Sequence, residues 1–124
     1  MTRKLWGGLQ AALFFAACAS APAIPGTWRG SSPNAAGTVL AFHDDGRLTW
    51  TFPAGTVEAR YTTRGHELDI TDFSGGMLQG SALYCIHEFQ TANRMRMDCE
   101  RGKPGQTGVR PKAYDPQQTQ VFER

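Results

Sequence analysis

Two cysteines in neighbouring segments restrict the fold of this chain more than any other feature. Residues from Cys85 to Phe89 and from Met95 to Cys99 follow the two-residue period of β-strands with one buried face. A three-residue loop at residues 91–93 places Phe89 opposite Met95, and the same register places Cys85 opposite Cys99. One loop therefore accounts for both an inward apolar face and a disulfide.

The other partners in this register are Gln90 with Arg94, His87 with Met97, and Glu88 with Arg96. The last of these pairs joins opposite charges across the outer face of the hairpin. Closing a loop of about 15 residues is worth about 3 kcal/mol in the chain-entropy model of disulfides. We therefore predict a hairpin that contributes much of the stability of a small domain.

The first 23 residues have the three-part layout of an export signal. Arg3 and Lys4 precede an apolar run over residues 5–17, and small residues follow it. The run is shorter than the roughly 20 apolar residues that a membrane-spanning helix needs. We therefore expect residues 1–23 to be a signal peptide and residues 24–124 to be one exported domain.

Residues 15–18, Phe-Ala-Ala-Cys, resemble a bacterial lipoprotein box, in which the signal ends before a cysteine that is lipidated. Lipidation of Cys18 would anchor the protein to the periplasmic face of the outer membrane. Cleavage after Ala19 or Ala23 is the alternative, and it leaves a soluble periplasmic or secreted protein. Either route leaves the other two cysteines as an even pair in an oxidising compartment, where a disulfide is expected.

Charge argues against a nucleic-acid partner. Without Arg3 and Lys4, the 11 remaining basic residues equal the 11 acidic ones, and the two kinds are interleaved. Phosphate binding requires a clustered basic face, so we expect no nucleic-acid partner. Two remaining thiols are also too few for a structural zinc site, and the sequence indicates no cofactor.

Residues 38–52 predict a second hairpin around Asp44-Asp45-Gly46. Glycine can take the left-handed position of such a three-residue loop, which sets Phe42 opposite Leu48. Most apolar side chains of this hairpin then share one face.

Residues 57–70 predict a third hairpin. A two-residue turn at Arg64-Gly65 sets Tyr61 opposite Leu68. Arginine suits the first position of that turn poorly, so a loop that includes Thr63 is the alternative.

Turn residues separate short strand-like segments throughout the domain, and we find no amphipathic helical stretch from residue 24 onward. Adding strands at residues 26–29 and 118–123 gives seven to eight strands. The sequence therefore predicts an all-β fold, a small antiparallel barrel or half-barrel.

Five motifs occur in a defined order: Gly26-Thr27-Trp28, Asp45-Gly46-Arg47-Leu48, Tyr61 with Leu68, Arg110-Pro111 and Phe122-Glu123-Arg124. This set, spread over most of residues 25–124, resembles the lipocalin-like (calycin-like) small secreted bacterial proteins, most closely a planctomycete-type group. The resemblance implies a lipocalin-like barrel in which Arg124 covers Trp28 as a cation–π contact. The paired cysteines depart from the pattern of that group.

Polar clusters do not predict catalysis. His43-Asp44-Asp45 could ligate a metal, but these residue types are typical of turns. Glu67, Asp69 and Asp72 could act as paired carboxylates, but the first two alternate with apolar residues and are expected on a solvated face. No serine lies in a Gly-x-Ser-x-Gly elbow. We therefore expect no catalytic residues, no metal and no enzyme activity.

Barrels of about eight strands either fill with side chains or hold one small ligand. If the interior is hollow, the candidate ligand contacts are His87, Trp50, Tyr61 and Met97. For His87, a core or rim histidine bonded to a backbone carbonyl is the favoured interpretation. The long loop at residues 101–116 is where we expect a binding rim.

These observations favour a non-enzymatic binding module for a small apolar or amphipathic ligand. The alternative is an envelope lipoprotein that acts through protein–protein contact, such as an inhibitor of an extracellular hydrolase that presents the 101–116 loop.

Overall fold

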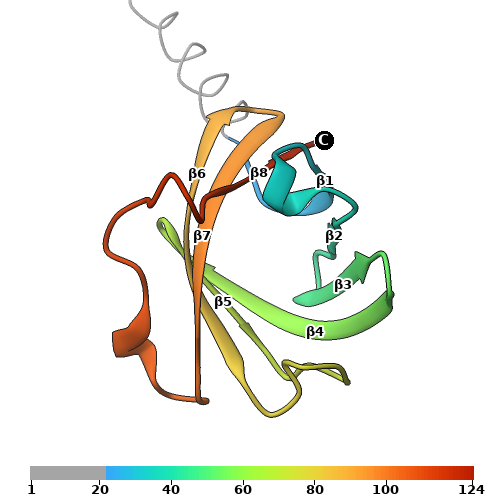
Figure 1. Cartoon of the computed structure of the whole chain (residues 1–124), viewed down its shortest axis with the longest axis vertical. Coiled ribbons are helices and arrows are strands. Elements are labelled where there is room, and N and C mark those ends of the chain that lie inside the picture. The colour runs from blue at the N-terminus through green and yellow to red at the C-terminus, as the bar shows by residue number, and fades with distance from the viewer. Residues whose placement is uncertain (1–21) are drawn as a thin grey trace, which may run out of the picture.

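The structure is a computed structural model that describes residues 22–124, and it is a closed antiparallel β-barrel (Figure 1). Its strands are β1 (Gly26–Gly30), β2 (Val39–Phe42), β3 (Arg47–Phe52), β4 (Gly55–Arg64), β5 (Glu67–Thr71), β6 (Ala82–Thr91), β7 (Arg94–Gly102) and β8 (Gln120–Glu123). Each strand pairs with the next, and β8 pairs with β1. The predicted all-β fold is confirmed as an eight-stranded barrel rather than a half-barrel.

Two short 3-10 helices, η1 (Pro33–Ala35) and η2 (Thr107–Val109), lie in the connections between strands. Within residues 22–124, no helix has the length and hydrophobicity needed to span a bilayer. The predicted lipidation site Cys18 and nearly all of the predicted signal peptide lie outside the described residues.

The β6–β7 hairpin has the predicted register. Cys85 pairs with Cys99 and the two form a disulfide, while Glu88 pairs with Arg96 and accepts a hydrogen bond of 2.8 Å from its guanidinium. The disulfide therefore joins directly opposed residues of adjacent strands.

The loop of this hairpin is shorter than predicted. Thr91 pairs with Arg94, and Gln90 falls in a β-bulge instead of facing Arg94. The Thr91 hydroxyl accepts a hydrogen bond of 3.1 Å from the Asn93 amide, which stabilises the tighter turn.

The predicted register of the β4–β5 hairpin is wrong by two residues. Tyr61 pairs with Ile70 rather than Leu68, because the turn lies at Gly65-His66. Gly65 has φ of +62°, the left-handed region that favours glycine, and it takes the first turn position. A two-residue shift leaves every side chain on its predicted face, so the core is unaffected.

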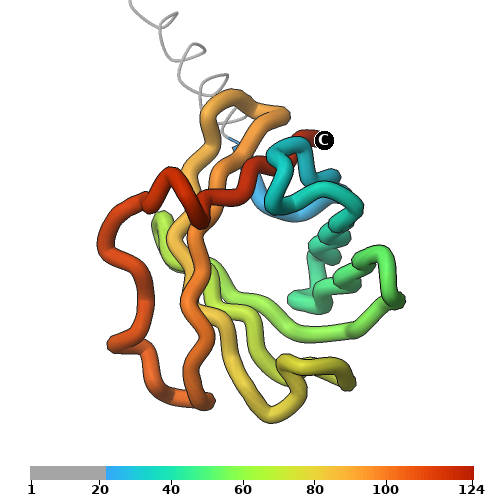
Figure 2. Tube along the Cα trace, viewed as in Figure 1, coloured from blue at the N-terminus to red at the C-terminus, as the bar shows by residue number. Residues whose placement is uncertain are grey.

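The strands curve around a common axis (Figure 2), and their inward side chains form the core. The β2–β3 hairpin contributes Phe42 opposite Leu48, as predicted. The largest fully buried apolar side chains are Trp28, Leu40, Leu48, Leu68, Ile70, Met95 and Phe122.

Alternate connections of an antiparallel barrel share one end. The β2–β3, β4–β5 and β6–β7 turns lie at the same end as Pro22 and Arg124, which we call the terminal end. The other end, which we call the loop end, carries the connections 31–38, 53–54, 72–81 and 103–119.

Candidate functional site

At the terminal end, contacts join the two ends of the domain. The indole nitrogen of Trp28 donates a hydrogen bond of 2.8 Å to the Ile24 carbonyl. The Arg124 guanidinium lies 4.2 Å from the centre of the Trp28 ring, where the resemblance places it. It also donates to the carbonyls of Ala23 and Pro25. These contacts hold the entering chain across the barrel.

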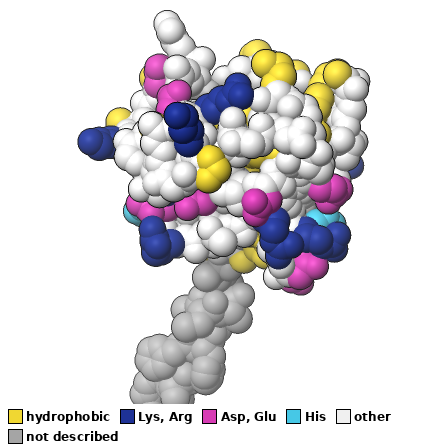
Figure 3. Space-filling view, turned by 90° about the horizontal axis from the view of Figure 1, so that it is seen from below, with side chains coloured by type: hydrophobic (Ala, Val, Ile, Leu, Met, Phe, Trp, Pro, Cys, Tyr) yellow, Lys and Arg dark blue, Asp and Glu magenta, His cyan; other side chains and the backbone are white. Residues whose placement is uncertain are grey.

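The loop end is hollow. It contains an open, mainly apolar cavity of about 540 Å³, within the range of about 300–1,000 Å³ typical of ligand pockets. In Figure 3, hydrophobic side chains gather at the upper right of the face shown, and charged side chains are spread over the rest of that face. The main apolar walls are formed by Trp50, Phe52, Val57, Phe73, Met77 and Leu78.

One wall of the cavity is the 72–81 connection, and hydrogen bonds hold it beside β4. The Ser74 amide donates to the Glu58 carbonyl at 2.8 Å, and the Glu58 amide donates to the Ser74 hydroxyl at 2.9 Å. Phe73 is buried, with its ring centre 6.0 Å from that of Trp50. The connection therefore forms part of the cavity wall beside β4.

Arg101 lies at the rim of this cavity. Every second residue of β7 faces inward, so Arg101 continues the row begun by the buried Met95 and Met97. Its Nη2 donates to the Met77 carbonyl at 2.7 Å, and its Nε donates to the Ser81 hydroxyl at 3.1 Å. The guanidinium is thereby fixed against the 72–81 connection.

The structure does not bring the four candidate ligand contacts together. Trp50 lines the loop-end cavity, whereas Tyr61 and His87 line a separate hollow of about 270 Å³ at the terminal end. Met97 is buried in the core. The Tyr61 hydroxyl donates to the His43 carbonyl at 2.6 Å, and burial raises the pKa of Tyr61, with smaller contributions from nearby aspartates.

His87 is only 6% exposed, and its ring lies edge-on to Phe89 with the centres 5.6 Å apart. Its Nδ1 is buried and has no hydrogen-bond partner within residues 22–124. Burial lowers the pKa of His87 below its ordinary value. The neutral imidazole is therefore the favoured form.

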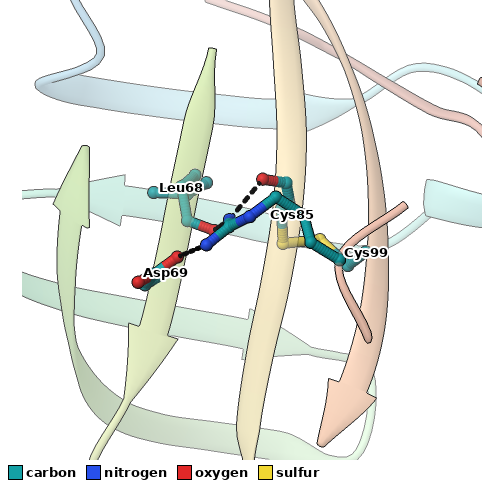
Figure 4. Close-up of a disulfide and its surroundings, with 5 residues drawn as sticks. Leu68, Asp69, Cys85 and Cys99 are labelled. Atoms are coloured by element: carbon teal, nitrogen blue, oxygen red, sulfur yellow. Dashed lines mark hydrogen bonds and ion pairs between the residues drawn. A yellow bond between two sulfur atoms is a disulfide. The ribbon is translucent and has the colours of Figure 1, made fainter. Parts of the chain in front are cut away.

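The long β7–β8 connection lies along the outside of the barrel rather than at the cavity. Arg110 anchors it, with only 10% of its side chain exposed. Its guanidinium donates to the carbonyls of Leu68 at 3.4 Å and Cys85 at 2.9 Å, and to the Asp69 carboxylate at 2.6 Å (Figure 4). This segment braces the outer face of β5 and β6 opposite the disulfide.

Two further contacts tie down the same connection. The Arg96 guanidinium stacks 3.7 Å from the centre of the Tyr114 ring, and the Asp115 amide donates to the buried Asp98 carboxylate at 2.7 Å. The loop-end cavity and the anchored part of the connection therefore lie apart, and of residues 101–116 only Arg101 lines that cavity.

Glu67 and Asp69 lie on the outer face and alternate with buried apolar residues, as expected, but their carboxylates are also paired with a cation. Asp69 and Glu67 lie 2.6 and 3.7 Å from the Arg110 guanidinium, a partner remote in sequence. At the β2–β3 turn, Asp45 accepts hydrogen bonds from the backbone and side chain of Arg47, which is turn chemistry. Within the described residues, no group of three metal-ligating side chains is present.

Sequence reasoning missed Phe73, Met77 and Leu78 as cavity residues, and it placed Arg101 in a loop instead of on the inward face of β7. Three apolar residues in an otherwise Gly- and Ser-rich segment were one available signal. The two-residue period of β7 was the second signal, since every second residue from Met95 faces inward and this row includes Arg101.

No family model matches the chain, and no match was found among the curated proteins or the solved structures. Fold and site together define a class: a small, closed, eight-stranded antiparallel β-barrel with an apolar cavity at one end. The lipocalin-like resemblance stays a prediction.

Proposed function

We propose that this barrel is a non-enzymatic, lipocalin-like binding module that holds a small apolar or amphipathic ligand in the loop-end cavity. The observation that carries the proposal is the open cavity of about 540 Å³ walled by aromatic and aliphatic side chains. Apolar surface in contact with water is unfavourable, and a ligand that covers it recovers about 25 cal/mol for each Å² removed from water.

The ends of the barrel fit an exported, tethered protein. Pro22 lies at the terminal end, and the cavity opens at the loop end. Lipidation of Cys18 would therefore attach the membrane at the far side of the barrel from the cavity. We include this anchor, at the periplasmic face of the outer membrane, in the proposal.

Protein–protein contact at the same rim is the second candidate function. Met77 is 84% exposed beside the cavity, and large exposed apolar side chains at a concave surface favour association. Native mass spectrometry of protein purified from its own envelope separates the two candidates. A co-purifying lipid-sized mass supports the binding module, and a co-purifying protein supports the second function.

Binding in the cavity is tested with N-phenyl-1-naphthylamine, a neutral apolar fluorophore, and two matched substitutions. Ala54 lines the cavity, whereas Ala92 is exposed at the terminal end. We expect saturable binding to the unmodified protein, at least tenfold weaker binding to Ala54→Phe because the ring occupies cavity volume, and unchanged binding to Ala92→Phe. Absence of binding, or equal effects of the two substitutions, would contradict the proposal.

A further inference from the structure

The inward-facing side chains of β7 are apolar in the core, but the one at the loop end is basic. Met95 and Met97 are buried apolar residues, and Arg101 occupies the corresponding inward position at the cavity rim. A cation at this position places charge where a ligand leaves the apolar interior and meets water. The other cavity-lining residues within residues 22–124 are uncharged, so Arg101 sets the sign of charge at the opening.

Arg101 is oriented but has hydrogen-bonding capacity left. Its Nε donates to the Ser81 hydroxyl and its Nη2 donates to the Met77 carbonyl. No carboxylate within the described residues forms an ion pair with it. A guanidinium carries five N–H donors, so its Nη1 group remains able to donate to an oxygen acceptor. Fixing the guanidinium beforehand reduces the entropy lost when an anion binds.

We propose that Arg101 binds the carboxylate of a single-chain fatty acid whose hydrocarbon chain lies in the loop-end cavity. This inference rests on the proposed function and adds the chemical class of the ligand. The apolar wall accommodates the chain, and the guanidinium makes charge-assisted hydrogen bonds to the head group. Arg101 thereby selects carboxylates over neutral or cationic amphiphiles of equal chain length.

The test compares three ligands of equal chain length at pH 7.5: dodecanoate, dodecan-1-ol and dodecyltrimethylammonium. Their affinities are measured by isothermal titration calorimetry below the concentration at which each aggregates. We expect the unmodified protein to bind dodecanoate about tenfold more tightly than dodecan-1-ol, because hydrogen bonds that involve charged groups are stronger than those between neutral groups. We expect dodecyltrimethylammonium to bind most weakly.

Arg101→Gln is expected to remove the preference for dodecanoate while leaving the affinity for dodecan-1-ol within about twofold, and Arg101→Lys to restore part of it. Lys103→Gln is the matched control, because it removes an equal charge at the same end and lies outside the cavity lining. It should leave the preference unchanged.

The outcomes separate this inference from the proposed function. If Arg101→Gln keeps the carboxylate preference, the head-group site is wrong and the cavity remains a binding site. If it weakens all three ligands equally, Arg101 only positions the 72–81 connection, and the inference is again overturned. If no ligand binds to the unmodified protein, the proposed function fails as well.

Discussion

The Arg124 guanidinium lies 4.2 Å above the Trp28 ring and joins the last residue of the chain to the first strand. The same side chain donates to the carbonyls of Ala23, Pro25 and Ala92, so it fixes the entering chain and the β6–β7 turn together. One cation thus ties together the chain segments at the terminal end, whereas the mainly apolar cavity of about 540 Å³ lies at the loop end.

Replacing Arg124 with Met should lower the free energy of unfolding by about 2 kcal/mol, because a cation–π contact and several hydrogen bonds are lost. Arg124→Lys should lose less. Arg64→Met is the control, since the Arg64 side chain is 83% exposed and its ion pair with Glu67 is worth about 0.5 kcal/mol. Urea denaturation measures all three variants, and equal losses for Arg124→Met and Arg64→Met would disprove the role of this contact.

Removing the disulfide in a Cys85→Ala/Cys99→Ala variant should lower the free energy of unfolding by about 3 kcal/mol, the value expected for a closed loop of about 15 residues. Dithiothreitol should destabilise the natural protein similarly and have no effect on the variant. Urea denaturation with and without reductant makes the comparison. A natural protein that is indifferent to reductant would show that no such bond forms in solution.

Arg110→Met should release the β7–β8 connection from the barrel wall. We expect a loss of about 2 kcal/mol in the free energy of unfolding, because the substitution leaves the Asp69 carboxylate without its charged partner. Hydrogen exchange over residues 103–119 should accelerate. Adding Asp69→Asn should recover part of the loss, and Lys112→Met should have little effect. Unchanged exchange in Arg110→Met would mean that other contacts hold the connection.

His87 should make the protein less stable in weak acid. Its pKa is lowered in the folded state by burial, whereas the unfolded pKa is about 6.5. Between these two values the unfolded chain binds more protons, so the free energy of unfolding falls as the pH drops below about 6.5. His87→Phe should flatten this part of the profile between pH 5 and 8, whereas His66→Gln should keep most of it, because the His66 charge makes only a smaller contribution to the His87 pKa than burial does. Parallel profiles for His87→Phe and the natural protein would contradict the assignment.

The alternation of inward and outward side chains, together with turn chemistry, explains which parts of the fold were predictable. The β6–β7 register followed from Cys85 and Cys99, because a disulfide constrains two strands at once. The β4–β5 register had no such constraint, and its turn lies at Gly65-His66 instead of Arg64-Gly65, with Gly65 at a positive φ. Strand identity is therefore readable from local pattern, whereas register depends on where one turn lies.

The candidate site was predictable only in part. Trp50 was identified, and it lines the cavity beside Phe73. The position of Phe73 depends on how the 72–81 connection is held by β4, which no local pattern specifies. Likewise, Glu67 and Asp69 have the pattern of a solvated face, and their partner Arg110 is distant in sequence. The cavity wall and the carboxylate partners depend on contacts between segments remote in sequence, which the alternation of apolar and polar residues does not specify.

Occupation of the loop-end cavity is tested most directly by nuclear Overhauser effects between bound dodecan-1-ol and methyl-labelled protein. The account predicts cross-peaks from the ligand chain to the methyl groups of Val57, Met77 and Leu78, which line the cavity. It predicts none to the Ile24 methyls at the terminal end. Cross-peaks confined to Ile24, or none to any of these groups at saturating ligand, would contradict the central claim that the loop-end cavity is the binding site.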